Sequence, residues 1–162
     1  MAKLSYAAIA SLDGYIEDEQ ARSTGPSRTR WSMPSSTSSS VPLARISSAA
    51  AWRGADKIVY ATTLESVSTA RSRLERQFDP QAVRQLKAAS ARDLAVAGPA
   101  LASAAFAASL VDELHLFLVP VLVGGGKHAL PDHVHLQLEH EEQRSFSSGV
   151  VYLRYRSAQR AP

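Results

Sequence analysis

The residues best placed to do chemistry form the run Ser11-Leu12-Asp13-Gly14-Tyr15-Ile16, which follows a short apolar stretch from Leu4 to Ala10. The apolar stretch predicts a buried strand, and open α/β sheets bind ligands at the carboxyl ends of their strands. There Asp13 could orient a polar substrate or relay a proton. Gly14 would let the backbone approach a flat ring closely. Asp-Gly is also a favoured turn dipeptide, so the pair alone predicts no more than a turn.

A second candidate is the turn at Gly98-Pro99, between a predicted strand from Asp93 to Ala97 and an alanine-rich helix from Ala100 to Leu110. Free amide groups and the positive end of a helix favour a phosphate group. Pro99 removes one amide donor, and many such turns bind nothing. The turn is therefore a candidate phosphate site on weak evidence.

Two further sequence patterns give weaker evidence of a binding site. Gly124-Gly125-Gly126-Lys127-His128 lacks the upstream glycine of a phosphate-binding loop and has histidine where that loop has Ser or Thr, so a flexible turn is expected. His133 and His135 would share one face of a strand, as metal ligands can. The chain has no cysteine to join them, and nearby glutamates indicate a solvated surface strand. No metal site is predicted.

The elements that must position these residues alternate along the chain. Further strands are expected at Ile58 to Tyr60 and at Glu113 to Val123, where Pro120 indicates a bulge or an edge. Asp79-Pro80 opens a helix. The tail from Leu136 to Arg156 reads as an antiparallel hairpin with its turn near Ser147-Ser148-Gly149. This order predicts an α/β fold: a layered, mostly parallel sheet with helices on both faces, extended by the C-terminal hairpin.

The bulk composition fits one cytoplasmic domain. The chain has 162 residues, a formal net charge of +3 and no cysteine. The absence of cysteine excludes disulfides. No apolar run is long enough to cross a membrane, so no membrane partner is expected. The mild charge does not argue for nucleic acid.

The segment from Arg22 to Ala51 differs from the rest of the chain. It contains ten serines, three prolines and four arginines, without a single Asp or Glu. It has no strand or helix period, so one interpretation is a disordered insertion with few buried side chains. Nucleic-acid binding through its arginines is a weaker alternative, because Trp31 is its only aromatic residue.

Several motifs resemble, in order, those of the dihydrofolate-reductase-like reductases related to the C-terminal domain of the bifunctional riboflavin biosynthesis protein. The resemblance covers Met1 to about Asp18 and then Trp52 to the end. Its parts are Ser11 to Ile16 (S-L-D-G-x-I), Ala55 to Leu64 (A-D-K-x-V-x-S-R-T-L), Ala97 to Pro99 (G-G-[SP]), Leu110 to Leu114 (L-V-D-E-x) and Val119 to Gly126 (P-V-x-x-G-x-G). The last two together are the most specific part.

The resemblance implies a three-layer αβα sandwich that binds NADPH, usually dimerises and reduces a small pterin- or ribosylaminopyrimidine-like substrate by hydride transfer. It would place Asp13 towards the substrate, and Ala8 and Gly14 near the nicotinamide. It would place Thr62, Thr63 and Leu64 near the adenosine, and Gly98, Pro99, Ala100 and Leu101 at the pyrophosphate. We expect a homodimer with Leu116 to Val123 and the C-terminal strands near the interface. A non-catalytic relic with impaired cofactor binding is the alternative.

Three departures from the family pattern matter. Ala61-Thr62 stands where S-R is usual, and Ala97 stands where the first glycine is usual. The family motif G-T-Y-L-x-G-R-R, whose G-R helps to bind cofactor phosphate, is absent. However, suitable codons for Ala44 to Trp52, read one base early, spell G-T-Y-L-F-G-R-R-L. We therefore expect Arg22 to about Ala51 to be an out-of-frame translation, with a deletion restoring the frame near Arg53.

Overall fold

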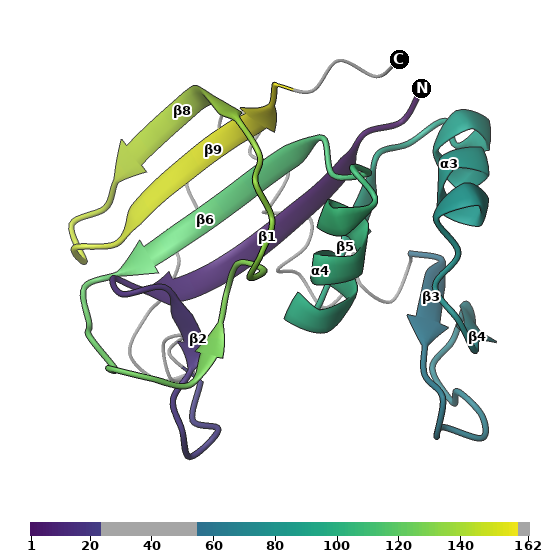
Figure 1. The fold of residues 1–162 in the computed structure, drawn as a ribbon, viewed down its shortest axis with the longest axis horizontal. Coiled ribbons are helices and arrows are strands. Elements are labelled where there is room, and N and C mark those ends of the chain that lie inside the picture. The colour runs from purple at the N-terminus through teal and green to yellow at the C-terminus, as the bar shows by residue number, and fades with distance from the viewer. Residues whose placement is uncertain (24–54, 159–162) are drawn as a thin grey trace. The chain divides into compact units, whose positions relative to one another are not determined.

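Strand β1 (Leu4–Ser11) lies between two parallel neighbours in a five-stranded sheet of order β5-β1-β6-β9-β8. The structure, a computed structural model, describes residues 1–23 and 55–158. β5 (Leu94–Val96) and β6 (Glu113–Val119) run parallel to β1, and β8 (Leu138–Ser145) and β9 (Val151–Ser157) form an antiparallel hairpin beside β6 (Figure 1). The predicted α/β fold with parallel strands and a C-terminal hairpin is confirmed.

One face of the sheet is apolar and carries helix α4 (Pro99–Ala107). Alternate side chains of β1 are buried, and the ring of Tyr6 meets the ring of Phe106 edge-on at 5.7 Å. Ala102 and Ala105 are fully buried in the helix. Small side chains at these positions let α4 pack closely, so the alanine-rich composition serves packing as well as helix formation.

Helix α3 (Pro80–Ala89) begins at the proline, as predicted, and is held by a buried lysine. The Nζ of Lys87 donates to the carbonyl of Leu110 (2.9 Å) and to Oδ2 of Asp112 (2.6 Å). The same carboxylate oxygen accepts the amide of Leu4 at 2.6 Å. Because buried charges need partners, this cluster ties α3 to the starts of β1 and β6.

The opposite face of the sheet holds a buried polar group. Nδ1 of His115 lies 2.8 Å from the Tyr152 hydroxyl, and its Nε2 lies 3.4 Å from Oε2 of Glu113. Both rings are almost inaccessible to water. Burial raises the pKa of Tyr152 to about 12 and lowers the pKa of His115. The imidazole is therefore held mainly neutral by its environment.

The chain after β6 differs from the predictions. The expected strand Glu113 to Val123 ends at Val119, because Pro120 interrupts the ladder and the Val121 amide turns back to the Val119 carbonyl at 2.8 Å. Where a flexible turn was expected, β7 (Lys127–His128) pairs antiparallel with β2 (Tyr15–Glu17). The expected strand through His133 and His135 does not form, and His133 has a φ of 60°.

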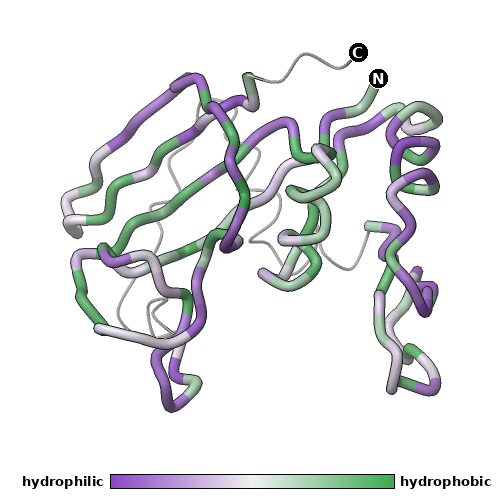
Figure 2. Tube along the Cα trace, viewed as in Figure 1, coloured by the Kyte–Doolittle hydropathy of each residue, from purple (hydrophilic) through white to green (hydrophobic). Residues whose placement is uncertain are grey.

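The chain divides into two compact units: residues 1–32 with 80–162, and residues 33–79. In the second unit, β3 (Lys57–Tyr60) pairs parallel with β4 (Ser72–Glu75) in a sheet of their own. The strand predicted at Ile58 to Tyr60 is present, but the prediction that it belongs to the central sheet is wrong. β4 was not predicted, because Ser72–Glu75 mixes polar and apolar residues without a distinct run (Figure 2).

Two further observations bear on the predictions. No helix in the described part of the chain is long and apolar enough to cross a membrane. Of the unusual segment, Arg22 and Ser23 are exposed, and residues 24–51 lie outside the described ranges, so the expectation of little regular structure there stays a prediction.

Candidate functional site

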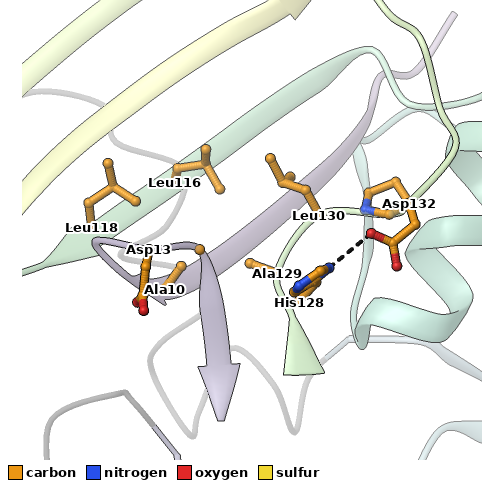
Figure 3. Close-up of a pocket in the computed structure, with 10 residues that line it drawn as sticks. Ala10, Asp13, Leu116, Leu118, His128, Ala129, Leu130 and Asp132 are labelled. Carbon is orange, nitrogen blue, oxygen red and sulfur yellow. Dashed lines mark hydrogen bonds and ion pairs between the residues drawn. The ribbon is translucent and has the colours of Figure 1, made fainter. Parts of the chain in front are cut away.

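A cavity of about 280 Å³ opens at the carboxyl ends of β1 and β6. Its floor is made by Ala10, Leu116 and Leu118, which lie on the same face of two paired strands (Figure 3). Its rim carries polar groups, including Asp13, His128 and Asp132. An apolar floor with a few polar groups at the edge is the usual form of a small-molecule site.

Asp13 lies on this rim, but its carboxylate is already engaged. Oδ2 of Asp13 accepts the amides of Gly124 (2.8 Å) and Val123 (3.1 Å), which come from the loop after β6. A hydrogen bond with the Ser11 hydroxyl and these amides lower the pKa of Asp13. Asp13 is therefore an ionised anchor for a loop beside the cavity.

Gly14 turns the chain from β1 into β2. Its φ of 92° lies in the left-handed region, its amide donates to the Ser11 carbonyl at 2.9 Å, and its carbonyl accepts the amide of Ala129 at 2.9 Å. A glycine is needed here because other residues rarely adopt this φ. Gly14 lines the cavity. Ala8 lies deeper on the same face and is buried, outside the residues that line the cavity.

The turn at Gly98 leads into a helix start that has no side-chain cap. Gly98 has a φ of 87°, precedes α4 without a side-chain cap, and has open space where a Cβ would stand. Ala100 and Leu101 form the first turn of the nine-residue helix. β5 runs parallel to β1, so this turn follows a strand that ends at the same edge of the sheet as the cavity. A helix start in this position favours an anion.

Thr62, Thr63 and Leu64 belong to the second unit, where all three are exposed in the loop after β3. The Arg76 guanidinium donates to the carbonyls of Thr62 and Leu64. An arginine therefore shapes the loop that the resemblance assigns to the adenosine.

The sequence interpretation missed a pair of side chains at the cavity. Nδ1 of His128 lies 2.9 Å from Oδ1 of Asp132, and the rings of His128 and Tyr15 lie 4.8 Å apart. Figure 3 shows both members of the pair at one end of the cavity. Spacing of four residues identifies such a pair only on a helix. His128 ends the short strand β7 and Asp132 lies in the loop after it, so no sequence signal could have found the pair.

Comparisons with known proteins agree with this fold. A family model described as the RibD C-terminal domain matches residues 33–152. The match begins inside the unusual segment and leaves out Ser11 to Ile16, so its range differs from that expected from the motifs. Among curated protein sequences, none matches the chain.

Several solved structures share the fold at low sequence identity. A putative riboflavin biosynthesis protein from Shewanella sp. PV-4 has a TM-score of 0.71 and 16% identity, with 98% of this chain and 100% of that chain covered. A pyrimidine reductase-like protein from Corynebacterium diphtheriae has a TM-score of 0.59 and 14% identity, with 98% and 93% covered.

A longer structure extends the comparison. It is a diaminohydroxyphosphoribosylaminopyrimidine deaminase/5-amino-6-(5-phosphoribosylamino)uracil reductase from Thermotoga maritima. Its TM-score is 0.62 at 12% identity. The match covers 97% of this chain but only 57% of that one, so this chain corresponds to just over half of that protein.

Proposed function

Because the chain belongs to the RibD C-terminal domain family, we propose that it is an NADPH-dependent reductase of a small pterin- or ribosylaminopyrimidine-like substrate. The observation that carries the proposal is the cavity at the carboxyl ends of β1 and β6, with its apolar floor and polar rim. A flat heterocycle suits that floor, and open α/β sheets bind ligands at this edge.

Residues around the cavity and the Gly98 turn would hold the cofactor. Gly98, Pro99, Ala100 and Leu101 would hold the pyrophosphate, because an uncapped helix start and an open glycine allow a phosphate to approach. Ala8 and Gly14 would lie near the nicotinamide, and Thr62, Thr63 and Leu64 near the adenosine. When bound, the nicotinamide supplies a hydride to the substrate.

Asp13 would serve the substrate side by shaping the cavity. Its carboxylate fixes the amides of Val123 and Gly124, so the loop after β6 forms a defined wall. As an ionised group on the rim, it would also orient a polar substituent of the substrate. Asp13 would thus act on substrate position more than on cofactor binding.

The proposal includes a cytoplasmic homodimer that needs no metal, membrane or nucleic acid. Val121 and Leu122 follow β6 and are exposed by 44% and 73%. Exposed apolar residues beside a site are typical of surfaces that pair. A monomer mass by light scattering at micromolar concentration would contradict the dimer.

We further propose that Arg22 to about Ala51 is an out-of-frame translation within a single domain. The shifted reading G-T-Y-L-F-G-R-R-L supplies the family motif at the expected place between β2 and β3. The encoding DNA tests this directly: the shifted frame should be open and should encode that motif. Stop codons in the shifted frame would leave a genuine Ser- and Arg-rich insertion as the explanation.

Titration with NADPH tests the proposed cofactor binding and the proposed shift of reading frame together. Without the arginine motif the chain lacks charged contacts to cofactor phosphate, each worth about 1.5–3 kcal/mol, or roughly one to two decades of affinity. We expect weak NADPH binding by the chain as written and micromolar binding once the frame and lost residues are restored. Nucleotide fluorescence on both versions measures this.

The outcomes separate the alternatives. Micromolar binding by the chain as written would exclude the non-catalytic relic. Failure of the restored version to bind NADPH would overturn the reductase proposal.

A further inference from the structure

The wall of the cavity that carries His128 is held rigidly by contacts from two strands. The Ala129 amide donates to the Gly14 carbonyl at 2.9 Å, and the buried Tyr6 hydroxyl donates to the Ala129 carbonyl at 2.7 Å. His128 itself pairs with Tyr15 across β2 and β7. The backbone under the imidazole is therefore fixed from the floor and from the side, unlike that of a free loop.

The imidazole is oriented as well as anchored. Asp132 contacts Nδ1 at 2.9 Å, and the Tyr15 ring lies against the imidazole at 4.8 Å. A carboxylate on Nδ1 keeps a proton there and leaves Nε2 as the atom that exchanges protons. The His128 side chain is 47% exposed, so water can return a proton to Nε2 after each transfer.

The cavity needs a proton donor, and Asp13 is poorly suited. Within residues 1–23 and 55–158, three titratable side chains line the cavity: Asp13, His128 and Asp132. The Ser11 hydroxyl and two backbone amides lower the pKa of Asp13, so it holds no proton near neutral pH. Histidine is the side chain that ordinarily exchanges protons in this range.

We propose that His128 is the general acid of the reaction in this cavity and that Asp132 is its positioning residue; this rests on the proposed reductase function. Reduction of a C=N or C=O bond places a hydride on carbon and moves the π electron pair onto nitrogen or oxygen. That atom then takes a proton, which Nε2 of His128 supplies and water replaces. The nicotinamide is oxidised as the substrate bond is reduced, so charge and electrons balance.

The kinetic test uses the full chain with millimolar NADPH and 5-amino-6-(5-phosphoribosylamino)uracil as the probe. His128→Asn should lower kcat by about 10²-fold or more, as expected for loss of a general acid, with KM little changed. Asp132→Asn should lower kcat by about tenfold, because the imidazole loses the carboxylate that orients it. His133→Asn is the matched control: His133 is exposed, does not line the cavity and has a φ that asparagine tolerates.

A second readout does not depend on turnover. Imidazole nitrogen NMR of the full chain should show the Nδ1-protonated tautomer of His128, and Asp132→Asn should change that signal while leaving His133 unchanged. Three side chains surround His128: Asp132 in the loop after β7, Tyr15 on β2 and Asp13 across the cavity.

Each outcome decides the proposal. Equal kcat for His128→Asn and His133→Asn in an active chain would overturn the acid role and leave the reductase proposal intact. A His128 signal insensitive to Asp132→Asn would overturn the positioning role. If the chain neither binds nor oxidises millimolar NADPH, the reductase proposal is wrong. The acid role of His128 in this chain is then wrong as well.

Discussion

The five-stranded sheet and the β3–β4 unit are stabilised by different interactions. Around β1 and β6, apolar side chains are buried against α4, and the polar groups that are buried have partners. Among residues 55–79 no side chain is buried, and the contacts are backbone pairing, surface arginines and the Tyr60–Phe78 ring pair. The cavity proposed for the substrate therefore lies over a packed core, whereas the loop proposed for the adenosine has surface contacts.

The largest expected effect comes from removing core volume beside β1. Phe106→Ala should lower the free energy of unfolding by about 3–5 kcal/mol, because the Phe106 ring is buried against Tyr6 and its removal leaves a cavity. Leu64→Ala, in the second unit, should change it by less than about 0.5 kcal/mol, because Leu64 is exposed. Urea unfolding of the unmodified chain and the two variants measures both changes in stability. Similar losses for the two variants would break the contrast between the regions.

The free energy of unfolding should also change with pH, by a smaller amount. Burial lowers the pKa of His115, against the opposing influence of Glu113. In the unfolded chain a histidine titrates near 6.5, so below that pH the unfolded state binds more protons than the folded state. The free energy of unfolding should therefore fall as pH drops from about 6.5 towards the lowered value, by at most about 1.4 kcal/mol per pH unit.

Denaturant unfolding at pH 7.5 and 5.5 checks the sign. His115→Gln should reduce the pH dependence, whereas His133→Asn, an exposed control, should retain it. The second unit contains no histidine between residues 55 and 79, so it cannot contribute to this slope. A wild-type chain that is equally stable at both pH values would contradict the role of His115.

The parts of the fold that the sequence predicted are those with a strong local pattern. The apolar run of β1, the proline at the start of α3 and the glycine before α4 each have a local physical cause. The strands that escaped prediction are β2, β4 and β7, of two to four residues. Such short strands have too few positions to show a period and form only because a distant partner supplies their hydrogen bonds.

The candidate site was predictable only where a glycine marked it. Gly14 and Gly98 both have positive φ, which their residue type allows. The contact from Asp13 to Gly124 joins residues 111 apart in sequence, and the pair of His128 and Asp132 depends on a loop conformation. Neither has a local signature, because the first contact is set by the pairing of β1 with β6 and the second by the backbone after β7.

The smallest expected effect is on turnover and cofactor binding, and it compares Asp13 beside the cavity with Thr62 in the loop after β3. In the frame-restored chain, Asp13→Asn should lower kcat by about tenfold while the Kd for NADPH stays nearly constant. Asparagine keeps one oxygen for the Gly124 amide but loses the charge that holds both amides, so the cavity wall shifts beside the substrate. Thr62→Ala, in the loop assigned to the adenosine, should instead weaken NADPH binding and leave kcat at saturation nearly unchanged. Steady-state kinetics with fluorescence titration measures both quantities for each variant. If Asp13→Asn weakened NADPH binding as much as it slowed turnover, Asp13 would belong to the cofactor side, and the division between a substrate region and a cofactor region would be lost.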